Sequence, residues 1–181
     1  MGTILDIVGS LAIRAVIILV VIGLTITLRD ALYKKTSRTT TSQTLANAAT
    51  VMEKDIRLAG YNSASWPFVS ADSSQFTFLA DLNNVGNVDT VQYLLTRDPN
   101  DLDPNSQVRL LARVVDGQTS TTLATGVMTL QFTYFDSVGV STANLGNVQS
   151  VKVALSLLDP YPPDTAYAVV RREFRVFPGN L

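Results

Sequence analysis

The chain has 181 residues, of which 16 % are charged, well below the share of about 25 % in soluble domains. Basic and acidic residues number 14 and 15, so the chain lacks the basic excess typical of nucleic-acid binders. It contains no histidine and no cysteine. These absences exclude the commonest general base, thiol nucleophiles, disulfides and cysteine or histidine metal sites. We therefore expect a protein that is not an enzyme and has no catalytic residues.

The apolar residues gather near the N-terminus. Residues 7–28 read IVGSLAIRAVIILVVIGLTITL, and Arg14 is the only charged residue among them. A helix of this length crosses a hydrocarbon core about 30 Å thick. Asp6 precedes the segment and no Lys or Arg does, whereas a signal peptide begins with basic residues. The sequence therefore predicts a retained transmembrane helix.

Four cations follow this segment, namely Arg29, Lys34, Lys35 and Arg38. By the positive-inside rule, they would place the region after the helix in the cytoplasm. The resemblance described below indicates the opposite orientation, so the charge pattern alone leaves the orientation open.

A second periodic pattern continues the helix. Apolar residues recur at spacings of three and four, which is typical of one face of an amphipathic helix: Leu45, Ala49, Met52, Ile56 and Ala59. Gly60 is a natural C-terminal stop. We expect one helix from about residue 3 to residue 58. The alternative is two helices joined by a loop at residues 36–42, which are rich in threonine and weak in helix propensity.

After Gly60 the apolar pattern changes to a period of two. Strands are expected near residues 76–80, 91–95, 108–115, 127–135, 151–157 and 167–177. Asp116 and Gly117 form a dipeptide typical of hairpin turns. In residues 127–135, one predicted face holds Met128, Leu130, Phe132 and Tyr134. In the last strand, Arg171, Glu173 and Arg175 mark the solvent side.

Short turns between successive strands predict an antiparallel sheet. The amphipathic helix would cover one face of this sheet. The predicted fold class is therefore α+β, with a long N-terminal helix packed on an antiparallel β-sheet head. Residues 1–59 would form the helix, and residues 60–181 the globular head.

Three short motifs resemble those of type IV pilins and pseudopilins, whose mature chains begin Phe-Thr-Leu-Ile-Glu. This chain reads Gly2-Thr3-Ile4-Leu5-Asp6. Residues 57–61 (RLAGY) and 132–136 (FTYFD) are similar to J-type minor pseudopilins and W-type minor pilins. The chain differs from the family in having Gly2 at the processing position, Asp6 in place of Glu, an added Arg14, and Gly23 where many pilins have proline.

The resemblance implies a structural subunit of a pilus-like or pseudopilus filament, with roles in adhesion, motility or secretion. The subunit would reside in the inner membrane and then assemble into a periplasmic or extracellular filament. Its partners would be further copies of itself and other pilins or pseudopilins. The alternative is a single-pass, membrane-anchored binding or scaffold protein with a β-rich head.

The two charged residues at the apolar end are candidate assembly residues. The resemblance implies that Asp6 pairs with the N-terminal amine of a neighbour and sets the register of assembly. We further expect Arg14 of one subunit to pair with Asp6 of the next, because a cation within a membrane helix requires a partner. The alternatives are a hydrated Asp6 at the membrane interface and an Arg14 that extends to the headgroups.

Other candidate residues are small or acidic. Gly9 and Gly23 would allow close packing between helices, and Gly23 would add local flexibility. Asp101 and Asp103 resemble the opening of a calcium loop but lack its glycine and closing glutamate. We expect Asp101 and Asp103 to lie in a solvated turn, so no cofactor is predicted.

Overall fold

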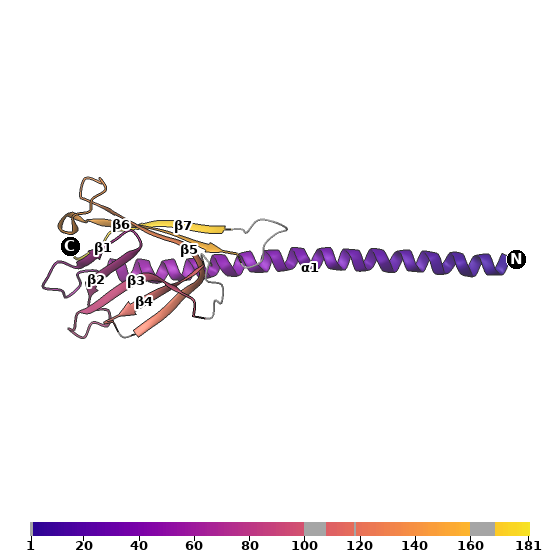
Figure 1. Cartoon of the computed structure of the whole chain (residues 1–181), viewed down its shortest axis with the longest axis horizontal. Helices are drawn as coiled ribbons and strands as arrows, with labels where there is room; N and C mark the ends of the chain where they lie inside the picture. The colour runs from indigo at the N-terminus through magenta and orange to yellow at the C-terminus, as the bar shows by residue number, and fades with distance from the viewer. Residues whose placement is uncertain (1, 100–107, 118, 160–168) are drawn as a thin grey trace.

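The computed structural model describes residues 2–99, 108–117, 119–159 and 169–181. A long helix, α1 (Gly2–Arg57), extends from a head built on one antiparallel sheet (Figure 1). The strands lie in sequence order: β1 (Phe68–Ala71), β2 (Gln75–Ala80), β3 (Asp89–Arg97), β4 (Arg109–Val115), β5 (Thr119–Phe135), β6 (Ser150–Leu158) and β7 (Val169–Val176). A short 3-10 helix, η1 (Leu145–Asn147), precedes β6. The α+β fold predicted from the sequence is confirmed.

Helix α1 is continuous through residues 36–42, so the alternative of two helices and a loop is wrong. The Thr39 hydroxyl donates to the main-chain oxygen of Lys35 at 2.9 Å, which keeps this polar group bonded within the helix. The head also contacts the segment, because the Ser37 hydroxyl donates to the carboxylate of Asp159. Thr41 is only 7 % exposed. These tertiary contacts outweigh the weak helix propensity of the threonines.

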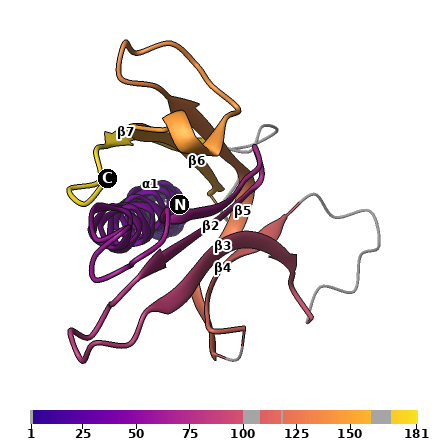
Figure 2. The same cartoon turned by 90° about the vertical axis from the view of Figure 1, so that its left-hand side faces the viewer.

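The C-terminal part of α1 supplies one side of the core. The predicted apolar face is buried: Leu45, Ala49, Met52 and Ile56 on the helix, and Ala59 just after its end. Ala48, which the spacing did not include, is buried with them. The helix contacts β5, β6 and β7. Viewed along α1, the sheet curls around the helix, with β6 and β7 on one side and β2 to β4 on the other (Figure 2). Burial of this face therefore attaches the helix to the head.

Gly60 reverses the chain immediately after the helix. Its φ is +84°, a conformation that favours glycine. The Gly60 N–H donates to the oxygen of Leu79 at 2.8 Å, and an added Cβ would lie 2.2 Å from the main-chain oxygen of Asn180. The turn therefore packs directly against the C-terminal tail.

Replacing Gly60 with alanine is expected to lower the free energy of unfolding by more than the ~1–2 kcal/mol of the backbone strain alone. Gly86→Ala is the matched control, because Gly86 has a φ of +86° but no atom within 4 Å of an added Cβ. Chemical denaturation of both variants measures the difference. Equal losses would show that the contact with Asn180 adds no penalty.

Strand β5 joins the two halves of the sheet. Its first part pairs with β4 as far as Val127, and its second part, from Val127 to Phe135, pairs with β6. Gly126, with a φ of +76°, lies at this change of partner. The sequence predicted only the second part, because the first part is rich in serine and threonine and lacks apolar alternation.

The predicted inward face of this strand is correct except at Met128. Leu130, Phe132 and Tyr134 are buried, whereas Met128 is 38 % exposed and Val127 is fully buried. The register shifts between Val127 and Thr129. A bulge of this kind moves the preceding side chains to the opposite face.

Contacts between aromatic rings join β2 to β5 across the curled sheet. Phe76 on β2 lies 5.5 Å from the rings of Phe132 and Tyr134 on β5, measured between ring centroids. The Phe132 N–H donates to the oxygen of Ser73 at 2.8 Å, and the Tyr134 hydroxyl donates to the oxygen of Asp72 at 2.8 Å. The turn between β1 and β2 is thereby fixed to β5, so the two halves share one core.

The remaining strand predictions agree with the structure over the residues that it describes; the first two residues of the predicted strand 167–177 lie outside them. The faces formed by Phe76, Phe78 and Ala80 and by Val151, Val153, Leu155 and Leu157 are buried. Asp116 and Gly117 both have positive φ values, 54° and 67°, and they lie in the connection between the paired strands β4 and β5, as the predicted hairpin turn requires. On β7 the charged side chains predicted to face solvent are exposed: Arg171, Glu173 and Arg175.

Candidate functional site

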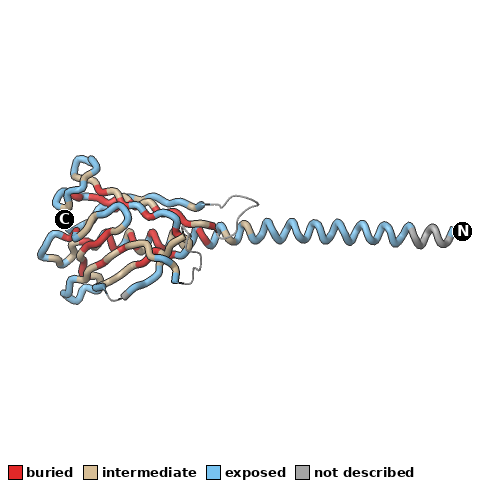
Figure 3. Tube along the Cα trace, in the orientation of Figure 1, coloured by how far each residue is buried: buried red, intermediate tan, exposed pale blue. Residues whose placement is uncertain are grey.

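The N-terminal half of α1 is apolar and lies outside the head. Its most apolar 18-residue stretch has a mean hydropathy of 2.6, and none of that stretch is buried. The described residues along this part of the helix are coloured as exposed (Figure 3). Within the described residues, it belongs to the one helix long and apolar enough to cross a membrane. A helix that is apolar on all sides requires lipid or other helices around it.

Arg14 is an exposed charge within this apolar surface. The backbone of Asp6 belongs to α1, but its side chain lies outside what the structure describes. The two positions are eight residues apart in the helix, which is about 12 Å along its axis. A direct ion pair between them would therefore have to join two chains.

The glycines of this half leave the helix surface open. Gly2, Gly9 and Gly23 have no atom within 4 Å of an added Cβ. At Gly23 the helix is regular, and the Thr27 hydroxyl donates to the Gly23 oxygen at 3.0 Å. A single chain does not test the close helix packing predicted at Gly9 and Gly23 or the flexibility predicted at Gly23, so both stay predictions.

A buried polar cluster fixes α1 to the sheet. One carboxylate oxygen of Asp55, on α1, accepts from the Tyr93 hydroxyl on β3 and from the Arg113 Nε on β4, each at 2.6 Å. Asp55 is 5 % exposed and Tyr93 is fully buried. Burial, and then the charge of Asp55, raise the pKa of Tyr93 above its usual range. Burial alone would lower the pKa of Arg113, but the hydrogen bond and charge of Asp55 raise it.

Sequence reasoning missed this cluster. Asp55 lies on the apolar helix face, between Met52 and Ile56. A carboxylate in that position requires a buried partner. Its place in the apolar pattern could have identified Asp55, but the pattern gives no information about which partners it contacts.

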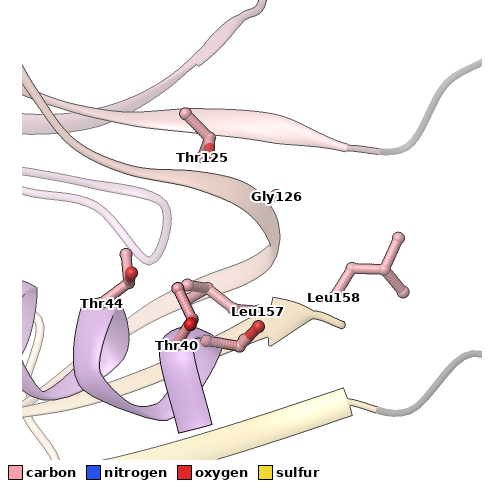
Figure 4. A pocket seen from close by; sticks show the side chains of 7 residues that line it. Thr40, Thr44, Thr125, Gly126, Leu157 and Leu158 are labelled. Atoms are coloured by element: carbon pink, nitrogen blue, oxygen red, sulfur yellow. The ribbon is translucent and has the colours of Figure 1, made fainter. Parts of the chain in front are cut away.

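A second polar contact holds the helix where it leaves the head. The Asp159 carboxylate, 1 % exposed, accepts from Ser37 and lies 4.0 Å from the Nε of Arg38. Nearby, a small pocket lies between the helix, β5 and the end of β6 (Figure 4): Thr40, Thr41, Thr44, Thr125, Gly126, Leu157 and Leu158. Its volume of about 170 Å³ is below the ~300–1,000 Å³ of ligand pockets.

The candidate calcium ligands Asp101 and Asp103 lie outside the described residues. In the part of the chain that is described, no three His, Cys, Asp or Glu side chains gather in a way that could hold a metal ion. The described residues show two features that bear on function: an exposed apolar helix surface, and a head that buried contacts attach to the same helix.

These features define a class of protein: an α+β head carried on a single helix that is able to span a membrane. No protein-family model matches the chain, and no curated protein matches its sequence.

Proposed function

We propose that the chain is a structural subunit of a type IV pilus-like or pseudopilus filament that assembles through its apolar N-terminal helix. The observation that carries the proposal is the division of α1. One part packs into the head between Leu45 and Ile56, and the other is apolar and, over its most apolar described stretch, not buried by the head. Such a helix can be held in a membrane and later packed against its equivalents in a fibre core.

Arg14 favours packing between subunits over a lone anchor. It lies roughly 5 Å from the middle of the apolar segment. A guanidinium at that depth in lipid costs about 2.5–3.5 kcal/mol. A carboxylate from a neighbouring helix would offset this cost, and Asp6 of the next subunit supplies one. Because this contact joins different surfaces of two copies, repeating it produces a fibre.

In this proposal the subunit resides in the inner membrane before assembly and contributes to a periplasmic or extracellular filament afterwards. Its head forms the outer shell, and the bare helices form the core. The partners are further copies of the chain and other pilins or pseudopilins.

Electron microscopy of sheared surface material, with antibody against the head, tests the proposal. Labelled fibres are expected. A chain that stays in the membrane fraction as a detergent-soluble monomer would favour the anchored binding or scaffold protein instead. The cations after the apolar segment support that second candidate: Arg29, Lys34, Lys35 and Arg38.

The pair between Asp6 and Arg14 predicts a charge-swap result. Asp6→Arg and Arg14→Asp should each abolish fibres, because each leaves like charges facing one another in a desolvated contact. The double variant should restore fibres at least in part. Asp30→Arg, an exposed change beyond the apolar segment, is the control and should leave fibres intact. If the double variant restores nothing, Asp6 and Arg14 do not pair.

A further inference from the structure

Strand β7 lies at one end of the sheet and pairs with β6 alone. Figure 2 shows it as the outer strand on its side of the curled sheet. Within the described part of the chain, the main-chain groups of β7 make no hydrogen bond beyond the ladder with β6. Five of its eight residues are exposed, so α1 does not cover the strand. Such an edge can accept a further strand through its open N–H and C=O groups.

The side chains of this edge carry uncompensated positive charge. Arg171, Arg172, Glu173 and Arg175 together have a net charge of two positive units. Glu173 is already neutralised, because it accepts from Arg171 and pairs with Lys152 of β6 at 2.6 Å. The side chain of Arg172 is exposed and forms no hydrogen bond or ion pair within the described residues. The edge therefore attracts negative charge.

Arg175 is held in a fixed orientation. Its guanidinium carbon lies 4.2 Å from the centroid of the Phe135 ring and 5.1 Å from that of the Phe177 ring. Its Nε donates to the Ser150 hydroxyl at 2.9 Å. Among the described residues, its two terminal nitrogens have no hydrogen-bond acceptor. A guanidinium fixed in this way loses little freedom when its remaining donors bind a carboxylate.

The sequence of β7 defines the strand that would fit beside it. In a sheet, directly opposite residues lie on the same face and contact one another. Opposite Arg171, Arg172 and Arg175, a complementary strand needs acidic residues. Opposite Val170 and Phe174 it needs apolar residues, and opposite the paired glutamate a neutral residue suffices. The complementary segment is therefore acidic, extended and partly apolar.

Strand β7 runs in the same direction as α1. Val169, at its start, lies beside the end of β6, where Asp159 accepts from Ser37 of α1. Just after its end, the Gly179 N–H donates to the oxygen of Arg57, the last residue of α1. The direction of an added strand is therefore linked to the direction of the membrane helix.

Two copies of this edge do not fit one another. In an antiparallel pair of β7 strands, the two α1 helices would point in opposite directions, so both could not enter one membrane from the same side. A parallel pair would place the arginines of one edge beside those of the other, and like charges on facing strands are unfavourable. None of the seven described strands carries more than one acidic residue. These points favour a strand from a different protein.

We propose that the β7 edge binds an acidic, extended segment of another protein, which joins the sheet as a further strand. Main-chain hydrogen bonds supply affinity, and the three arginines select acidic sequences. The proposal concerns the head and requires only that α1 spans a membrane, so it does not depend on filament formation.

Peptide binding to the full-length chain in neutral detergent tests the proposal. Fluorescence anisotropy follows a labelled acidic peptide, TVEETVEV, and the basic peptide TVKKTVKV is the comparison. The acidic peptide should bind and should slow hydrogen exchange of the β7 amides. Arg172→Gln with Arg175→Gln should weaken its binding by about two- to thirtyfold, because two cross-strand charge pairs are lost.

Two controls separate strand addition from general attraction between charges. Arg29→Gln with Lys35→Gln removes two exposed cations of α1 outside the head and should leave binding unchanged. The acidic peptide with N-methylated main-chain nitrogens keeps its charge but cannot donate, so it should not bind. Thermal unfolding should confirm that both variants keep the folded head. Failure of the acidic peptide to bind, equal binding of the basic peptide, or retained binding of the methylated peptide would each overturn the proposal.

Discussion

Replacing Asp55 with alanine is expected to lower the free energy of unfolding by about 3–5 kcal/mol, the usual cost of removing one partner from a buried ion pair. The same change leaves two donors without their acceptor, because the Tyr93 hydroxyl and the Arg113 guanidinium both donate to the lost carboxylate. Tyr93 is fully buried and water does not reach it. Urea unfolding of the full chain in detergent, followed by the fluorescence of Trp66, measures the loss.

Glu53→Ala is the matched control, because it removes another carboxylate of α1 that pairs with an arginine. The Glu53 and Arg57 side chains are 34 % and 62 % exposed, so their pair should contribute less than about 1 kcal/mol. If Asp55→Ala and Glu53→Ala cost the same, burial does not strengthen the Asp55 contact. A double-mutant cycle with Arg113→Ala then isolates the interaction between the two residues.

Replacing Val20 with arginine is expected to reduce membrane insertion by roughly two orders of magnitude, because a cation at mid-membrane costs about 2.5–3.5 kcal/mol. Val20 is 63 % exposed in the bare half of α1. The change leaves the folded head intact, since Val20 does not belong to the core. The fraction of chain that resists alkaline extraction from membranes measures insertion.

Leu32→Arg provides the comparison for this prediction. Leu32 is also 63 % exposed, but it lies after Arg29, where the apolar segment has ended. An added cation there should change insertion little. Equal extraction of the two variants would contradict the assignment of residues 7–28 as the membrane segment.

The parts of the fold that depend on local pattern were predictable from the sequence. Hydropathy is summed over all the residues of a long apolar segment. Residues 7–28 therefore indicated a helix able to span a membrane without knowledge of any tertiary contact. Alternation of apolar residues identified β6, where Val151, Val153, Leu155 and Leu157 are buried in the core. The end of α1 was predicted within one residue, because Gly60 is required for the turn that follows.

Features that depend on contacts between distant residues were not predictable. The bulge after Val127 moved Met128 to the exposed face, and nothing in the local alternation indicates a bulge. The contact between Ser37 and Asp159 joins residues 122 positions apart, and it helps a threonine-rich segment to stay helical. The partners of Asp55 likewise come from β3 and β4.

The path of α1 through the head has a mechanical consequence. The helix runs along the head and ends at the side remote from its own N-terminus, beside the C-terminal tail (Figure 1). There the Gly179 N–H donates to the Arg57 oxygen at 3.3 Å. A pull on the bare end of α1 therefore acts at once on every contact from Leu45 to Ile56 and on the Asp55 cluster. Tension is shared among these contacts in parallel, so no single one has to resist the full force.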